Sequence, residues 1–458
     1  MSGGLRSAVY PLLNLALPLV LTGLVQSSVY FFETLFLAKL GTDVMAAGAL
    51  VGWVFGTFMV IIFGTLSSIS VLVSHRHGAQ DEEGIRHVMR DGIILSLLLL
   101  VPSLILLWNL PAILVKTGQS AEVVRYAQSY LRILIWGAPP NFLMIALLEL
   151  IIGIGRSKDI AIFNMMLPLF SILLSYVFIF GHLGLPPLGI IGAGWGLASA
   201  SWLTAVLLVI YALTSKRYKK YLLGVLDFHP PFYLLELAKT GLPMGLMYSI
   251  EVGFFLALTL MMGMMGTDFL AANQIVMQFS GVIFSVIFSL AQAVTVRMGH
   301  LIGANNPDAA NAASRSGLAL SLIFMSIIAI VYWTAPGFLV GMDFDVHHEK
   351  NAAIFHLAKQ FFAVCAIFQI VEGTRISLFG SLRALRDTHF TLLVSIISYW
   401  GIALPVGYLL AWHVHLQGRG LWWGMVTGAL IAMIVLYCRL RSKMYRLILS
   451  QQEHTNAC

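Results

Sequence analysis

Apolar runs of about 20 residues recur along the whole 458-residue chain, separated by short polar stretches. One such run is enough for a helix to cross a hydrocarbon core of about 30 Å. These spans must be helical, because lipid offers no hydrogen-bond partner to an open backbone group. We predict twelve membrane-spanning helices, at approximately 11–38, 46–74, 92–115, 127–153, 161–181, 190–214, 237–264, 270–298, 316–341, 354–381, 389–412 and 420–440.

The second half of the chain repeats the first at a constant offset. Leu17-Pro18 recurs as Leu242-Pro243, and GTDVMAA at 41–47 recurs as GTDFLAA at 266–272, both 225 positions later. Shared hydrophobicity cannot place Gly, Pro and Asp at one offset, so a six-span unit is duplicated. The sequence therefore predicts an all-α polytopic membrane protein with two six-helix lobes. The pseudo-twofold axis that relates them should run along the membrane normal.

The repeat and the charge pattern set the expected boundaries. The basic stretch SKRYKKYLLGVLDFHPP ends in two prolines, as a cytoplasmic linker between lobes would. Pro18 and Pro243, at equivalent places in the lobes, would let their helices bend as hinges, or are ordinary helix-start prolines. We predict an N-lobe at 1–214, a linker at 215–236, a C-lobe at 237–441 and a cytoplasmic tail at 442–458.

Composition and charge place the chain in the bilayer. Hydrophobic residues make up 59% of it and charged residues 10%, against about 25% charged in soluble proteins. By position, 18 Lys and Arg fall on one side of the spans and 7 on the other. This asymmetry predicts a multi-pass plasma-membrane protein, in the inner membrane if bacterial, with both termini cytoplasmic. The net charge of +7 then reflects topology, and no nucleic-acid partner is needed to explain it.

Motifs of several enzyme classes are missing from the sequence. It contains no G-x-x-x-x-G-K-[ST] phosphate loop, no H-E-x-x-H and no G-x-S-x-G. Cys365, Cys438 and Cys458 lie far apart and match no metal spacing. We therefore expect neither ATP hydrolysis nor enzymatic catalysis, and no cofactor.

Glu33 interrupts the aromatic and aliphatic stretch SVYFFETLFLA in the first span. A carboxylate in mid-span costs several kcal/mol unless it is paired, solvated or protonated, so each one is a functional candidate. Glu33 has no ionisable neighbour nearby in sequence, which suits the exchange of a proton or a small cation. The alternative is a permanently protonated acid that is hydrogen-bonded to a neighbouring helix.

Three further acids fall within predicted spans. Glu251 aligns with Gln26 of the first copy, which suggests that the two lobes have divided their labour. Glu372 is followed one helical turn later by Arg375, so it is either a coupling acid or half of an intrahelical ion pair. Glu149 lies near the cytoplasmic end of its span, where we expect it to snorkel or to neutralise Arg156.

Other candidates are less specific. Ser171 and Ser175 offer oxygens to a cation, since hard cations prefer oxygen ligands, but interhelix hydrogen bonding is the commoner use of such residues. Tyr30 and Trp53 are candidates for stacking on a cationic compound, and Met261 for lining an adaptable pocket. Ordinary packing is the alternative for all three.

The ordered motifs resemble a known family. LALPLVLTGLVQSSVYFFETLFLAKLGTDVMAAGAL, SIEVGFF and FQIVEGTRISLFGSLRALRDT resemble the first, seventh and tenth spans of multidrug and toxic compound extrusion (MATE) transporters, in particular the bacterial NorM-type branch. The resemblance implies export of small cationic, aromatic compounds in exchange for H⁺ or Na⁺. It implies coupling at Glu33, Glu251 and Glu372, with a possible Na⁺ site at the last two, and substrate contacts at Glu33 and Glu251.

The chain departs from the family at three places. Glu33 stands where the family usually has Asp, Arg375 is unexpected beside the tenth-span acid, and Ser171 and Ser175 stand where Asn or Asp is frequent. These departures make protonation of Glu33 a reasonable substitute for a sodium site in the N-lobe. We expect the transporter to function as a monomer in the lipid bilayer.

Two alternatives stay open at this point. A flippase for lipid-linked sugars, of related architecture, would need arginines for a diphosphate, and Arg132 and Arg375 are the candidates. A polytopic membrane enzyme would need clustered His, Asp or Arg at one interface, which the sequence does not present.

Overall fold

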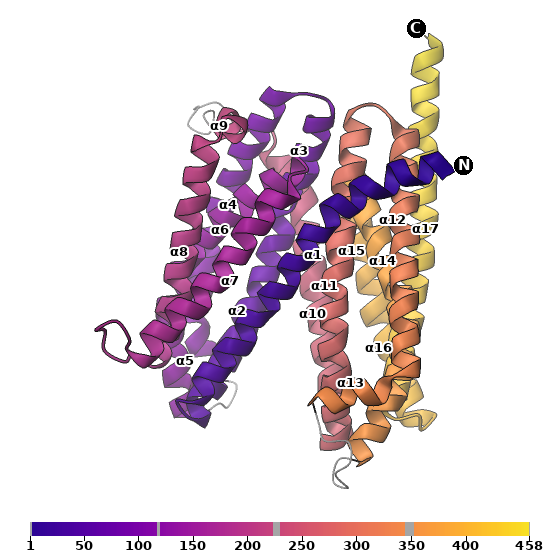
Figure 1. The fold of residues 1–458 in the computed structure, drawn as a ribbon. Helices are drawn as coiled ribbons and strands as arrows, with labels where there is room; N and C mark the ends of the chain where they lie inside the picture. Colours follow the sequence, from indigo (N-terminus) through magenta and orange to yellow (C-terminus); the bar gives the residue numbers. More distant parts are fainter. Residues whose placement is uncertain (1, 117–119, 223–229, 344–351, 458) are drawn as a thin grey trace. The chain divides into compact units, whose positions relative to one another are not determined.

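The computed structural model is helical throughout its regular elements (Figure 1). It describes residues 2–116, 120–222, 230–343 and 352–457, and within these ranges it gives only the backbone of 2–9, 24, 26–28, 30, 31, 116, 342, 343 and 454–457. The predicted all-α class is confirmed. The helix bounds in the first half are α1 Ser2–Ala38, α2 Thr42–Leu66, α3 Ser68–Gly78, α4 Glu82–Lys116, α5 Ala121–Leu134, η1 Ile135–Gly137, α6 Ala138–Gly153, α7 Ser157–Phe180, α8 Ile190–Thr214 and α9 Lys216–Leu222.

The second half contains two segments of π-helix, η3 and η4, inside one span. Its bounds are α10 Leu234–Met265, α11 Thr267–Gly303, α12 Pro307–Thr334, α13 Pro336–Asp343, α14 Ala352–Ala384, α15 Thr388–Ser395, η3 Ile396–Ala403, α16 Leu404–Tyr408, η4 Leu409–His413 and α17 Gly418–Ala457.

All twelve predicted spans coincide with helices. Among the described residues, 11 helical stretches are long and apolar enough to cross a membrane, and α1 adds the apolar segment Tyr10–Gly23. Several predicted ends are wrong: the span predicted from 92 begins at Glu82, and the one predicted from 316 begins at Pro307. Hydropathy reports the lipid-facing length, whereas a helix continues through polar residues once it leaves the membrane.

Contacts divide the chain into two compact units. The first unit is Leu17–Gly245, and the second is Met1–Ala16 together with Leu246–Cys458. The helices α1 and α10 therefore each begin in one unit and end in the other, and the division falls next to Pro18 in α1 and next to Pro243 in α10. The hinge role of these prolines stays a prediction, as do the lobe boundaries.

The segments predicted as linker and tail have helical structure. The range 215–236 contains α9, whose Tyr218 and Tyr221 are buried, and α9 packs against α8 and α4 within the first unit. In the predicted tail, α17 continues without a break to Ala457. The linker thus includes a packed element, because two of its tyrosines have apolar rings to bury.

Backbone geometry repeats along with the sequence. Gly41 and Gly266 precede α2 and α11 with φ values of 121° and 128°, a conformation that side chains rarely adopt. Gly92 lies against Ile69 in the first unit, and Gly317 lies against Val294 in the second, again at an offset of 225. The two units therefore contain the same local turns and close helix contacts.

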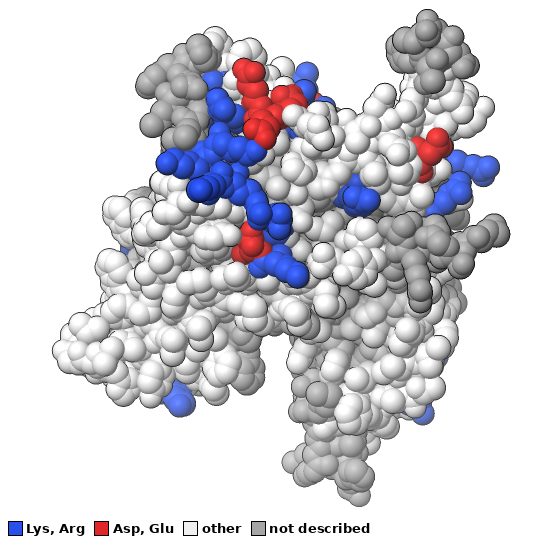
Figure 2. All heavy atoms as spheres, turned by 45° about the horizontal axis from the view of Figure 1, so that its top comes forward, with Lys and Arg blue, Asp and Glu red and all other residues white. Residues whose placement is uncertain are grey.

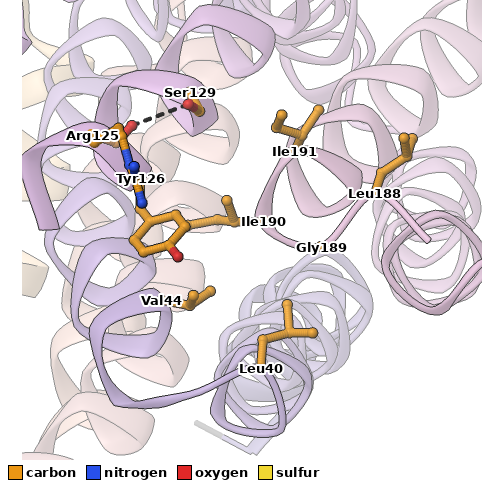
Figure 3. Close-up of a pocket in the computed structure, with 9 residues that line it drawn as sticks. All are labelled: Leu40, Val44, Arg125, Tyr126, Ser129, Leu188, Gly189, Ile190 and Ile191. Atoms are coloured by element: carbon orange, nitrogen blue, oxygen red, sulfur yellow. Dashed lines mark hydrogen bonds between the residues drawn. The ribbon is translucent and has the colours of Figure 1, made fainter. Parts of the chain in front are cut away.

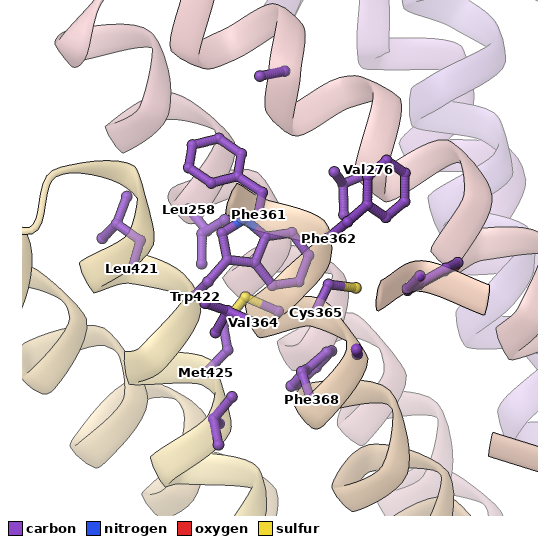
Figure 4. Close-up of a cluster of buried hydrophobic side chains, with 14 of the residues drawn as sticks. Leu258, Val276, Phe361, Phe362, Val364, Cys365, Phe368, Leu421, Trp422 and Met425 are labelled. Atoms are coloured by element: carbon purple, nitrogen blue, oxygen red, sulfur yellow. The ribbon is translucent and has the colours of Figure 1, made fainter. Parts of the chain in front are cut away.

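Aromatic and small side chains fill the interior of the second unit. Trp422 of α17 is fully buried among α14 residues, and its ring centroid lies 5.9 Å from that of Phe368 in an edge-to-face arrangement (Figure 4). Next to this cluster the backbones of α16 and α17 come close together at Gly407 and Gly424. Small residues allow this approach, and the resulting van der Waals contact holds membrane helices together.

A methyl group at Gly424 should therefore destabilise the second unit. A Cβ built there lies 2.4 Å from the Cα atom of Gly407 and 2.5 Å from the carbonyl oxygen of Ala403, and neither backbone atom can move aside cheaply. We expect Gly424→Ala to lower the free energy of unfolding by about 1–3 kcal/mol. The control is Gly281→Ala in α11, where nothing lies within 4 Å of the new Cβ. That variant should gain up to about 1 kcal/mol from helix propensity. Thermal unfolding in detergent measures both variants, and equal stability would contradict the close packing.

Candidate functional site

Arg375 lies at the centre of a buried ionic cluster in the second unit. Its Nε and Nη2 atoms donate to Glu372 Oε2 and Oε1 of the same helix, α14, at 2.8 and 2.7 Å. Its Nη1 donates to Glu251 Oε1 of α10 at 3.0 Å. Arg375 thus forms a bidentate contact with the carboxylate of Glu372 and a single hydrogen bond with that of Glu251. Such charge-assisted pairs are among the strongest hydrogen bonds in proteins.

Two hydroxyl groups complete the cluster. Tyr399 of η3 donates to Glu372 Oε2 at 2.8 Å, and Ser395 at the end of α15 donates to Glu251 Oε1 at 3.1 Å. Both oxygens of Glu372 and one oxygen of Glu251 are therefore hydrogen-bonded. The exposed fraction is 2% for Arg375, 3% for Glu372 and 7% for Glu251. With both acids ionised, the cluster carries a formal charge of −1 inside a low-dielectric environment.

The local helix geometry explains how three helices meet at this point. Glu372 and Arg375 are three residues apart on α14 and so lie on one face. The eleventh span changes to π-helix at Ile396, directly after Ser395. There the indole nitrogen of Trp400 donates to the carbonyl oxygen of Ile250 on α10 at 3.1 Å. Local π-helix is often found at functional sites.

Glu33 has a different environment in the first unit. Its carboxylate accepts a hydrogen bond from the hydroxyl group of Tyr130 on α5. Tyr130 is 1% exposed and belongs to an apolar cluster that also contains Phe36. The ring centroids of Phe36 and Tyr176 lie 5.7 Å apart. Glu33 itself is half-buried. A single acid with one phenol donor, beside aromatic rings, can take up a proton or attract an organic cation.

Among the side chains that the structure describes, no hydrogen bond or ring contact joins the other predicted site residues to these acids. Trp53 is 51% exposed, and Met261 packs against the apolar core of the second unit. The side chain of Tyr30 lies outside the described residues. Ser171 and Ser175 are buried, and Ser175 lies against Gly196 of α8, which indicates a helix-packing role. Among the described side chains, no hydrogen bond joins either serine to Glu33.

The expectation that Glu149 snorkels is wrong, and its neutralisation of Arg156 stays a prediction. This residue is 1% exposed and lies on α6 among buried apolar residues. The predicted Glu372–Arg375 pair is present, but it is not a closed intrahelical pair, because the same guanidinium also binds Glu251. Within the described ranges, no group of three His, Cys, Asp or Glu side chains could hold a metal ion.

A separate pocket of about 360 Å³ lies in the first unit (Figure 3). Leu40 lines it from the α1–α2 turn, Val44 from the first turn of α2, and Tyr126 from α5, one turn before Tyr130. Its charged lining residue, as far as the structure describes it, is Arg125. A positive charge at this rim disfavours the pocket as a site for cationic compounds.

The MatE family profile matches residues 18–177 and 243–409, one stretch in each half of the chain. The chain belongs to the MatE family. It is 34% identical over 425 residues to a probable multidrug resistance protein NorM of Burkholderia mallei, covering 92% of this chain and 90% of that protein. It is 30% identical to a probable NorM protein of Synechocystis, covering 97% and 96%.

Solved MATE structures share the fold. A crystal structure of MATE in the bent conformation superposes with a TM-score of 0.86 at 20% identity, covering 98% of this chain and 99% of that one. An outward-facing multidrug resistance MATE family transporter gives a TM-score of 0.85 at 21% identity, covering 97% and 98%. The predicted resemblance to MATE transporters is confirmed.

Sequence reasoning missed three partners of the acids in this MatE protein. Tyr399 lies 27 positions from Glu372, Ser395 lies 144 positions from Glu251, and Tyr130 lies 97 positions from Glu33. Their pairing depends on which helix faces approach one another, which periodicity does not reveal. A weak signal was available for Tyr399, since a Tyr in an apolar span needs a partner for its hydroxyl group.

Removing the shared guanidinium should destabilise the MatE protein. In Arg375→Gln two buried carboxylates lose their counter-charge, and we expect a loss of about 3–5 kcal/mol in the free energy of unfolding. The double variant Glu372→Gln/Arg375→Gln should recover part of this loss. Arg125→Gln is the control, because its side chain is 67% exposed and its ion pair is 3.9 Å long. The control should change stability by less than about 0.5 kcal/mol. Denaturation in detergent measures all three, and an Arg375 variant as stable as the control would contradict this interpretation.

Proposed function

We propose that this MatE protein exports small cationic organic compounds, aromatic ones in particular, in exchange for protons. The names of its relatives support export of multiple drugs, since proteins called multidrug resistance protein NorM match over nine-tenths of the chain. The observation that carries the proposal is the placement of its intramembrane acids. Both units hold carboxylates in membrane-spanning helices: Glu33 accepts a hydrogen bond from one phenol, and the Glu251–Glu372–Arg375 cluster carries a formal charge of −1 when both acids are ionised. Such sites attract a cation and release it on neutralisation.

Protons suit these sites better than sodium does. Sodium is a hard cation and binds through several oxygens at once. In the second unit Arg375 already occupies the position between Glu251 and Glu372 where such a cation would lie. In the first unit Glu33 has one phenol partner, and the described contacts bring no second carboxylate to it. A proton needs only one carboxylate oxygen.

The two acids of the second unit would then have different tasks. Glu372 accepts three hydrogen bonds, from two nitrogens of Arg375 and from Tyr399, and it holds the arginine in place. Glu251 has a second oxygen outside this network. We assign proton exchange in this unit to Glu251 and a positioning role to Glu372. In the first unit we assign proton exchange to Glu33.

The transport cycle follows from charge competition. With the site open to the outside, a proton neutralises the acid, the attraction for a cationic compound falls, and the compound leaves. After the protein opens to the cytoplasm, loss of the proton restores the negative charge and the affinity for the next compound. Each net inward charge gains about 2.3 kcal/mol per 100 mV of membrane potential, or about a fifty-fold concentration ratio if fully coupled. No ATP is needed on this chain.

The orientation of the protein in the membrane is part of the proposal. Lys and Arg side chains gather over the end of the first unit that carries α9, whose sequence is KRYKKYL (Figure 2). Within the second unit, α1 begins and α17 ends at one and the same end (Figure 1). The basic end supports a cytoplasmic position for α9, and the shared end of α1 and α17 agrees with an even number of spans. The asymmetry of Lys and Arg along the sequence supports cytoplasmic termini in a plasma membrane. The monomer contains all the acids that the proposal uses.

The flippase alternative has less support. It needs arginines that are free to bind a diphosphate. Arg375 is bound to two carboxylates, and the guanidinium carbon of Arg132 lies 3.3 Å from the ring centroid of Trp108. The two arginines also belong to different units.

Transport should not require sodium. We expect ethidium efflux from cells that express the protein to continue in sodium-free buffer and to stop when a protonophore removes the proton gradient. Fluorescence of intracellular ethidium measures the rate, and cells with an empty vector provide the baseline. Efflux that stops in sodium-free buffer while a proton gradient is present would contradict proton coupling.

Glutamine at the exchanging acids should uncouple transport. We expect Glu33→Gln and Glu251→Gln each to reduce efflux at least about tenfold, a loss of roughly 1.4 kcal/mol in transition-state stabilisation. Glu122→Gln is the matched control, because this glutamate is 66% exposed and pairs with Arg125 only at 3.9 Å. The control should transport at the wild-type rate. Wild-type efflux by both variants, at equal membrane abundance, would overturn the assignment of these acids.

A further inference from the structure

A second pocket, of about 880 Å³, lies between α12 and α17 of the second unit. Arg315 and Arg441 line it from the two helices, one from each. Neither arginine has a hydrogen-bond or ion-pair partner among the residues that the structure describes. Arg441 differs in this from the cations two positions before and after it on α17, since Arg439 and Lys443 both form ion pairs with Asp387. The pocket therefore contains two uncompensated positive charges.

The rest of the lining is amphipathic. Asn311 and Ser314 add polar groups from α12, whereas Leu318 on α12 and Ile448 on α17 add apolar walls. Tyr445 also lines the pocket and is 64% exposed. A tyrosine just beyond the end of a predicted membrane span, as Tyr445 is, is typical of the boundary between hydrocarbon and headgroups. A ligand that fits must carry a negative group beside an apolar body.

The sequence repeat shows what is different here. Arg315 corresponds to Arg90 of the first unit, 225 positions earlier. Arg90 is 2% exposed, pairs with Asp91 at 3.0 Å, and donates to the carbonyl oxygen of Pro230 at 3.0 Å. The counterpart of Asp91 is Ser316. The arginine is thus present in both units, but its carboxylate partner is present in only one.

The chain itself fills the corresponding space in the first unit. After α8 the backbone turns at Ser215, and α9 folds back against α8 and α4. Tyr218 of α9 is fully buried and its hydroxyl group donates to Asp159. This burial, together with that hydrogen bond, raises the pKa of Tyr218 above its ordinary value. In the second unit α17 continues as one helix past the corresponding position, and among the described elements no short helix follows it as α9 follows α8.

We propose that the α12–α17 pocket binds an anionic phospholipid. Its phosphate would lie between Arg315 and Arg441, and its acyl chains would run along Leu318 towards the membrane interior. Basic pockets between membrane helices on the cytoplasmic side are suited to acidic headgroups. The lipid would take the place in the second unit that α9 and Pro230 take in the first. This proposal does not depend on the coupling ion or on the exported compound.

A lipid titration with matched variants tests the proposal. The full-length protein, purified in detergent without phospholipid, is titrated with short-chain phosphatidylglycerol or with phosphatidylcholine of equal chain length, and the shift in melting temperature gives an apparent Kd. We expect a saturable shift with phosphatidylglycerol only. Arg315→Gln and Arg441→Gln should each weaken it about fivefold, and the double variant about 25-fold, since each surface cation contributes about 1 kcal/mol.

Arg419→Gln provides the control, because it removes the same charge from the opposite end of α17. It should bind phosphatidylglycerol like the wild type. Equal shifts with both lipids would overturn the proposal, as would equal weakening by the control. Displacement of the lipid by inorganic phosphate or glycerol phosphate would show a soluble anion site instead. If a variant does not fold, native mass spectrometry of the wild type decides, with phosphatidylglycerol expected to stay bound and its absence contradicting the site.

Discussion

The constraint that governs this transporter is the high free energy of a bare charge in a membrane-spanning helix. The second unit meets it with a single guanidinium, Arg375, shared between Glu251 and Glu372 and completed by two hydroxyl groups. At Glu33 the first unit pairs a carboxylate with one phenol, that of Tyr130. Neither solution removes all negative charge. Each site, with its acids ionised, keeps a negative charge that a proton or an organic cation can compensate, and the proposed transport by competition depends on that charge.

Duplication explains why the two units can differ at this point. The same close helix contacts recur at an offset of 225 residues, so the scaffold does not depend on the acids. Polar positions are then free to diverge, as they do where Gln26 stands for Glu251 and Ser316 stands for Asp91. The difference between Gln26 and Glu251 gives the two units different arrangements of intramembrane acids. The second difference, between Ser316 and Asp91, leaves Arg315 without its carboxylate and opens a pocket that lipid can fill.

The fold was predictable because hydropathy and repetition are local signals. Twelve apolar runs in the sequence predict the helices that are observed. Motifs repeated 225 positions apart predict that the chain has two related halves. The helix ends were not predictable from hydropathy, since α4 and α12 extend into polar residues that lipid does not cover. The acids themselves stood out because a carboxylate is rare in an apolar span, but their partners Tyr130 and Tyr399 looked like ordinary aromatic residues. Only the approach of helix faces brings those hydroxyl groups to the carboxylates.

The most direct test of proton exchange at the buried acids is proton flux in a reconstituted system. Purified protein is placed in liposomes that contain a pH indicator and no sodium, and an outward gradient of ethidium is imposed. The account predicts that protons enter the lumen as ethidium leaves, and that Glu251→Gln abolishes this flux while Glu122→Gln does not. Ethidium movement without any change in lumenal pH, in wild-type protein, would contradict it.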